Sequence, residues 1–175
     1  MKLIINDGGR AAAGFKGTAG DCVARSIAIV SGKPYGEVYR ALATGTGNQR
    51  AGKRGKRSAS ARSGINTKRK WFRDYMCSLG FTWTPCMKIG SGCKVHLADG
   101  ELPMGRLVVA LSGHYTAVIN GVINDIFDPQ RDKSWSFEPD HGQPLKPNQG
   151  RNVNGVWTEI GGRCVYGYWS LAGAS

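Results

Sequence analysis

The sequence lacks any apolar run approaching 18 residues, so no membrane span is expected. Residues 1–7 turn polar too early to form a secretory signal peptide. No CxxC pair and no phosphate-binding P-loop motif occur, which removes two common cofactor signatures. The five cysteines are an odd number in a chain of 175 residues, and this usage favours reduced thiols and a cytoplasmic protein.

Acidic residues are missing from one long segment. Residues 50–73 hold ten basic residues and no acidic one, whereas the rest of the chain is nearly balanced despite the overall net charge of +12. Because residues 44–66 offer almost no apolar anchor, a mobile basic loop is expected there. Residues 50–73 would attract nucleic acid or another anionic partner, although a solvated surface explains such a run equally well. The nucleic-acid-binding candidates are Arg50, Lys53, Arg54, Lys56, Arg57 and Arg62.

Hydrophobic periodicity predicts helices in the first half of the chain and strands in the second. Apolar residues at helical spacing predict helices over about 21–31, from Pro34 onward, and over 67–79, with Asp21 capping the first. Strands are expected at 81–84, 106–111, 114–119, 122–127 and 164–169. Four of the seven prolines fall within residues 129–162, which predicts a Pro/Gly-rich insertion. The order indicates one α+β domain over residues 1–175, with helices packed on an antiparallel sheet.

Asn120-Gly121 between two apolar runs predicts a two-residue hairpin turn. That turn places Ile119 opposite Val122, so the numbers of paired residues sum to 241. His114 then falls opposite Phe127, and Asp125 lies diagonally near His114 on the same face. A slip of one residue would bring Asp128 opposite His114 instead, although Asn-Gly favours Asp125.

Cys22 and His114 form the pair that could carry chemistry. Cys22 opens a predicted helix, whose N-terminal amides and dipole favour the thiolate form of a cysteine. Gly20 just before it allows a close approach of substrate to the backbone. A strand-borne His114 opposite this thiol, oriented by Asp125 or Asp128, would complete a triad for nucleophilic catalysis. A buried structural cysteine and a solvated aspartate remain the simpler alternatives.

Gly20-Asp21-Cys22 opening a helix, Gly113-His114-Tyr115-Thr116-Ala117-Val118 on a strand and Asn124-Asp125 on the next resemble the papain-like cysteine peptidase superfamily. The likeness is to small bacterial and phage-encoded members, some of uncharacterised function. It covers residues 15–128 and the last predicted strand. The resemblance implies a papain-like fold, cleavage of an amide bond in a protein or peptide, and no metal or organic cofactor. For a phage-encoded chain it implies the host cytoplasm or the virion.

One position departs from that pattern. The superfamily usually places a glutamine about six residues before the cysteine, where it donates a hydrogen bond to the developing oxyanion. Lys16 stands at that spacing here, so Lys16 itself or the upstream amide of Asn6 is the candidate donor. Losing one such donor costs about 10²–10³ in rate.

Four alternatives are considered at the level of sequence. Cys93 follows a Gly-rich loop and is a rival nucleophile, while Cys77, Cys86, Cys93 and His96 fit no established zinc spacing. The same triad would also suit deamidation or transamidation. A non-enzymatic phage or bacterial protein, binding nucleic acid or an acidic partner through its basic loop, is the main alternative to an enzyme.

Overall fold

A computed structural model describes residues 1–50, 58–88, 90, 92–130 and 163–171, together with the backbone of residues 134–138 and 156–160. The chain is α+β, with helices preceding most of the strands as the sequence predicts. The helices are α1 (Cys22–Ser31), α2 (Tyr35–Gly47) and α3 (Lys70–Ser78). No helix within the described residues is long and apolar enough to cross a membrane.

Each helix forms where apolar residues recur at helical spacing. In α1, Val23, Ile27 and Val30 are fully or almost fully buried. The helix ends at Gly32, whose left-handed backbone (φ 72°) lets its N–H donate to the carbonyl of Ala28. In α3 the two buried residues are Phe72 and Met76, which lie one turn apart.

Six strands form the central sheet, in the order β1-β5-β4-β3-β8-β2. Their bounds are β1 Leu3–Ile5, β2 Phe81–Pro85, β3 Arg106–Leu111, β4 His114–Ile119, β5 Val122–Asp125 and β8 Val165–Leu171. Strand β1 runs parallel to β5, with Leu3 opposite Ile123. The expectation of a purely antiparallel sheet is therefore wrong at this edge, because residues 3–5 add a strand that the sequence pattern did not reveal.

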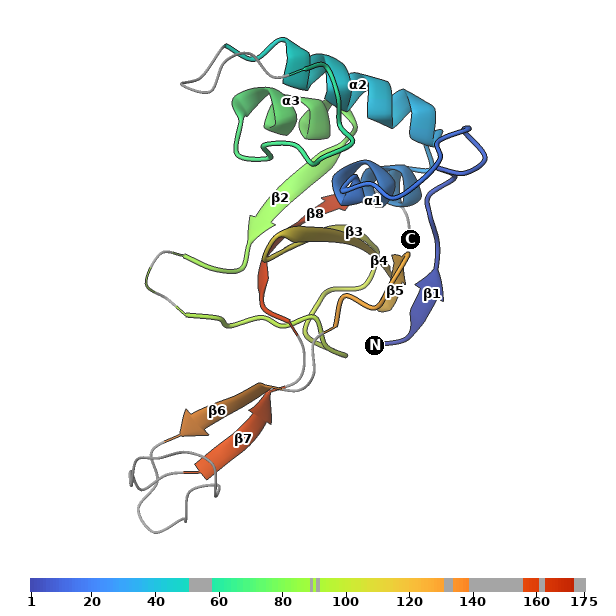
Figure 1. Ribbon diagram of the computed structural model, residues 1–175. Coiled ribbons are helices and arrows are strands. Elements are labelled where there is room, and N and C mark those ends of the chain that lie inside the picture. Colours follow the sequence, from blue (N-terminus) through green and yellow to red (C-terminus); the bar gives the residue numbers. More distant parts are fainter. Residues whose placement is uncertain are drawn as a thin grey trace.

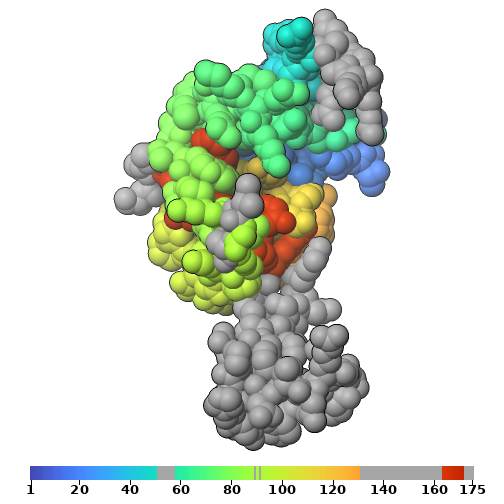
Figure 2. Space-filling view, turned by 90° about the vertical axis from the view of Figure 1, so that its left-hand side faces the viewer, coloured from blue at the N-terminus to red at the C-terminus, as the bar shows by residue number. Residues whose placement is uncertain are grey.

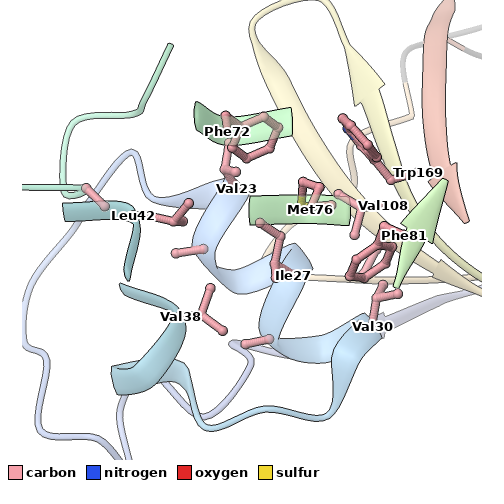
Figure 3. Packing of buried hydrophobic residues seen from close by; sticks show 14 of the residues in the cluster. Val23, Ile27, Val30, Val38, Leu42, Phe72, Met76, Phe81, Val108 and Trp169 are labelled. Carbon is pink, nitrogen blue, oxygen red and sulfur yellow. The ribbon is translucent and has the colours of Figure 1, made fainter. Parts of the chain in front are cut away.

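The two faces of the sheet are buried by different parts of the chain (Figure 1). The three helices cover one face, where Ile27, Phe72 and Met76 meet Val108 and Trp169 of the strands (Figure 3). On the other face Leu107, Val118 and Ile123 pack with Leu97 and Leu102, which belong to the segment between β2 and β3. Burial on both faces explains why β3 reads as a continuous apolar run.

The predicted insertion at residues 129–162 contains two paired strands. Strands β6 (Ser134–Glu138) and β7 (Val156–Ile160) pair antiparallel, with Ser134 opposite Ile160. Residues 131–133, 139–155 and 161–162 lie outside the described residues.

The predicted loop at residues 44–66 needs correction. Helix α2 continues through Gly47, and Ala61 is only 2% exposed within the core cluster beneath the helices. Ser60 lies 3.2 Å from the hydroxyl of Tyr39, and the guanidinium of Arg62 donates to the carbonyl of Thr18 at 3.2 Å. The stretch 58–66 is therefore anchored, because one small apolar side chain and several polar contacts replace the large anchors the sequence lacks. Residues 51–57 lie outside the described residues.

Enlarging Ala61 tests this anchoring. Ala61→Leu should lower the free energy of unfolding by about 1–3 kcal/mol, because a larger side chain must be forced into a filled core. Thermal denaturation should show a melting temperature lower by several degrees, at about 2–4 °C per kcal/mol for a chain of this size. Ala12→Leu, in an exposed turn, is the matched control. Equal melting temperatures for the two variants would mean that residues 58–66 are not packed.

Candidate active site

Cys22 is the first residue of α1 and is half-buried. The apolar stripe of α1 packs against the sheet, and this packing orients the first residue of the helix toward β4. The first amides of any helix have no acceptor within the helix, and they bias their surroundings toward negative charge. A thiol at this position is therefore favoured as the thiolate.

Asp21 occupies the N-cap position of α1, as expected, but its side chain makes no capping hydrogen bond. Its buried carboxylate instead accepts hydrogen bonds from the side chains of Arg25 and Tyr35, and from Nε of Arg10 at 2.8 Å. The capping geometry is lost because two guanidinium groups and a phenol compete for the same two oxygens. The consequence is a fixed backbone immediately before Cys22.

His114 and Asp125 are brought together by the hairpin of β4 and β5. The observed register pairs Ile119 with Val122 and Ala117 with Asn124, as the Asn120-Gly121 turn predicts. His114 Nε2 lies 2.7 Å from Asp125 Oδ2, and both residues are buried. The ring of Phe127 lies beside that of His114, with a centroid separation of 4.9 Å.

Asp128, the alternative third member, is not placed against His114. It is exposed, and its carboxylate accepts the backbone N–H of Gln130 at 2.8 Å. The structure thus brings together Cys22, His114 and Asp125, and leaves Asp128 in the turn beyond β5.

Cys22 and His114 shift one another's protonation. Burial raises the pKa of the Cys22 thiol, but a hydrogen bond and positive charge from His114, the backbone N–H of Tyr115 and the charge of Arg25 outweigh it, so the net pKa is lowered. For His114 burial acts in the opposite direction and lowers the pKa, because it disfavours the charged imidazolium. The hydrogen bonds to Asp125 and Cys22 outweigh burial and raise the pKa of His114 to about 9. Both shifts favour the ionised pair, in which a thiolate lies beside an imidazolium. Because Nε2 faces Asp125, Nδ1 is the ring nitrogen left for the thiol.

The pair opens into a cleft of about 800 Å³, within the range typical of ligand sites. Its walls come from the start of α1, from α3 and the segment before it, and from strands β2, β3, β4 and β8. In Figure 2, β8 (red) reaches the surface between the green residues around α3 and the yellow strands. The lining residues are Gly20, Cys22, Val23, Ser63, Gly64, Ile65, Thr67, Lys68, Arg73, Trp83, Ala110, Leu111, Gly113, His114, Tyr115, Tyr166 and Trp169.

Neither candidate oxyanion donor lines this cleft. The side chain of Lys16 is exposed, and its carbonyl accepts a hydrogen bond from Arg10 at 3.2 Å. Asn6 is bonded elsewhere: its Oδ1 accepts the N–H of Gly8 at 2.9 Å, and its Nδ2 donates to Asn124 at 3.3 Å. The amide of Cys22, at the open start of α1, is the donor that the fold itself places at the thiol.

The sequence pattern did not identify several residues that line the cleft together with Cys22. Thr67 and Lys68 precede α3, Arg73 lies on it, and Trp83 and Tyr166 come from neighbouring strands. The hydroxyl of Tyr115 donates to Thr67 Oγ1 at 2.9 Å, which fixes this wall to the residue after His114. No local motif marks these residues, because their proximity to Cys22 depends on the strand order of the sheet.

The basic candidates are only partly described. Arg50 is exposed, and Arg62 is bonded to the carbonyl of Thr18. The remaining four, Lys53, Arg54, Lys56 and Arg57, lie outside the described residues. A role of this segment in binding nucleic acid stays a prediction.

Two cysteines overturn the expectation of five reduced thiols. Cys93 and Cys164 form a disulfide, while Cys22, Cys77 and Cys86 are free. The bond forms because the segment before β3 runs alongside the start of β8. There the backbone of His96 pairs with that of Cys164 as an isolated antiparallel β-bridge. The N–H of Val165 also donates to the carbonyl of Val95 at 2.8 Å. Cys93 is thereby excluded as a nucleophile in this state.

Two of the four residues considered as metal ligands are bonded to other groups. Cys93 is bonded to sulfur, and Nδ1 of His96 lies 3.1 Å from Glu101 Oε2. Within the described part of the chain, no group of three or more histidine, cysteine, aspartate or glutamate residues is arranged to hold a metal ion.

The arrangement supplies a nucleophile, an acid–base group and a carboxylate that orients it, at the edge of an open cleft. Such a set can attack a carbonyl carbon and deliver a proton to a leaving group. Comparison with known proteins gives no match among family models, curated proteins or solved structures.

The ion pair predicts an unusually reactive Cys22. At pH 6–7 iodoacetamide should modify Cys22 at least about tenfold faster than the exposed Cys77, because an ordinary thiol is only a few per cent ionised there. Cys86, whose pKa burial raises, should react slowest. Mass spectrometry of tryptic peptides would give the three rates. Equal rates for Cys22 and Cys77 would rule out the ion pair.

Proposed function

We propose that this protein is a thiol hydrolase of the papain-like type, which cleaves an amide bond in a protein or peptide. The observation that carries the proposal is the thiol of Cys22 at the start of α1, paired with a His114 ring whose far nitrogen is bonded to Asp125 at 2.7 Å. The helix-then-sheet order and the order Cys, His, Asp along the chain support the papain-like assignment.

In the first half of the reaction, the Cys22 thiolate attacks the carbonyl carbon of the scissile amide. The carbon–sulfur bond forms as the carbonyl π electrons move onto oxygen, where the amide of Cys22 donates a hydrogen bond. When the tetrahedral intermediate collapses, the carbon–nitrogen bond breaks and the imidazolium of His114 gives its proton to the leaving amine.

In the second half, neutral His114 removes a proton from water, which attacks the thioester and releases the acid. The Cys22 thiolate leaves, and His114 holds the proton again. Asp125 keeps the imidazole in the tautomer and orientation that both halves need. An amine in place of water would give transamidation, and a glutamine side chain as substrate would give deamidation.

Removing members of the triad tests the proposal. Cys22→Ala and His114→Ala should each lower kcat by at least about 10⁴-fold on an internally quenched peptide library, since the triad acts as a unit. Cys77→Ala, which removes an exposed free thiol, is the matched control and should keep wild-type rates. Thermal denaturation checks that each variant is folded. Turnover that survives Cys22→Ala would refute the proposal, and so would a wild-type protein inactive on every peptide and glutamine substrate.

The pH profile should report the two shifted groups. Activity requires ionised Cys22, whose pKa is lowered, and protonated His114, whose pKa is raised to about 9. It should therefore rise at acid pH and fall as pH passes through about 9. Asp125→Asn removes one of the two bonds that raise the pKa of His114, so the alkaline limb should move to lower pH. An alkaline limb that stays in place in this variant would exclude Asp125 as the partner of His114.

A further inference from the structure

Part of the cleft wall is positively charged. Lys68 and Arg73 line it, and the lining residues include no aspartate or glutamate. When ionised, Cys22 and His114 carry opposite charges that offset one another, so Lys68 and Arg73 set the charge that an approaching substrate meets. A one-sided charge in a cleft with apolar walls concentrates ligands of the opposite charge.

Neither cation is neutralised by a carboxylate within the described residues. Asp74, the residue next to Arg73, is bonded to Lys70, with oxygens at 2.8 and 2.9 Å from Nζ. Both Lys68 and Arg73 are exposed to solvent. Their full charge is therefore available to a ligand.

The backbone beneath these cations is fixed. Thr67 accepts the hydroxyl of Tyr115 at 2.9 Å, which anchors the residue before Lys68 beside the reactive pair. Phe72, the residue before Arg73, is fully buried with its ring 6.0 Å from that of Trp169. Both cations thus project from positions that the core determines.

Aromatic rings also line this cleft. The rings of Trp83 and Trp169 lie 5.2 Å apart, and Tyr166 is a further lining residue. Trp83 lies directly over Gly167, where an added Cβ would come within 2.4 Å of the ring. The tryptophan can adopt this position because residue 167 has no side chain. The result is an apolar aromatic surface in the same cleft as the two cations.

We propose that Lys68 and Arg73 select a peptide segment with an acidic side chain close to the scissile amide, and that an apolar neighbour of this acid packs on Trp83 and Tyr166. This inference rests on the proposed thiol hydrolase function. The carboxylate would accept charge-assisted hydrogen bonds from the lysine ammonium and the arginine guanidinium. Peptides with a basic side chain at that place would be rejected by the same two charges.

Matched peptides would test the selection. In an internally quenched series that differs only in glutamate, glutamine or lysine at each position around the cleaved bond, one position should favour glutamate by about tenfold in kcat/KM. Lys68→Glu and Arg73→Glu should each abolish this preference, and the double variant should prefer lysine there. Arg40→Glu makes the same charge change on α2, outside the cleft, and should leave the preference unchanged. A wild-type enzyme that cleaves all three peptides equally at every position would overturn the inference while leaving the hydrolase function intact.

Binding without turnover separates the two proposals. Cys22→Ala should bind the glutamate peptide more tightly than the lysine peptide, as followed by the fluorescence of the cleft tryptophans. This preference should be lost when Lys68→Glu is added. If that result holds while the wild-type protein cleaves nothing, the acidic ligand stands and the hydrolase function fails. No binding of any peptide in the series would overturn the inference.

Two further ligands distinguish the source of the negative charge. The first is a peptide whose only acidic group is its C-terminal carboxylate, and its binding is compared with that of the same peptide as a C-terminal amide. Tighter binding of the free carboxylate than of the glutamate peptide would mean that the cleft takes a chain end in place of an acidic side chain. A single-stranded oligonucleotide that competes for the cleft, with affinity lost in Lys68→Glu and Arg73→Glu, would replace the acidic peptide with a nucleic acid. Failure of the oligonucleotide to displace the glutamate peptide supports the inference as stated.

Discussion

The buried carboxylate of Asp21 is the constraint on which the candidate site depends. It accepts hydrogen bonds from Arg10, Arg25 and Tyr35, and so ties the N-terminal loop, the first turn of α1 and the start of α2 to one point. Such a group is stable only as a set, because removing one partner of a buried ion pair costs about 3–5 kcal/mol. Cys22 follows Asp21 directly, so the geometry of the nucleophile is set by a network that itself takes no part in the proposed reaction.

The other end of α1 is held by the sheet. The guanidinium of Arg106, at the start of β3, donates to the carbonyls of Val30 and Ile29 at 2.5 and 2.8 Å. These carbonyls belong to the last turn of the helix, where the acceptors are unpaired and the dipole favours a cation. With both ends fixed, the helix that carries Cys22 is set against β4, which begins with His114. The placement of Cys22 near His114 therefore follows from contacts made well away from the cleft.

Local pattern predicted the parts of the site that depend on local structure. The Asn120-Gly121 turn set the register of β4 and β5 and thereby placed Asp125 beside His114, and the stripe of α1 placed Cys22 at a helix start. Contacts between distant segments were not predictable in this way. Strand β1 adds parallel to β5, and Cys93 meets Cys164 across 71 residues, because of strand order alone. A capping side chain was expected for Asp21, because the sequence around it gives no sign that Arg10, eleven residues earlier, contacts its carboxylate.

The segment between α2 and α3 joins the basic region to the proposed chemistry. Its residues looked separable from the core, because they carry charge and few apolar side chains. In the fold, Ala61 is buried under the helices, and Ser63, Gly64 and Ile65 form part of the cleft that contains Cys22. The wall of the cleft continues from there through Thr67 to Lys68. Arg62, which donates to the carbonyl of Thr18, directly precedes these lining residues, so the described end of the basic run belongs to the anchored wall of the candidate site and not to a separable appendage.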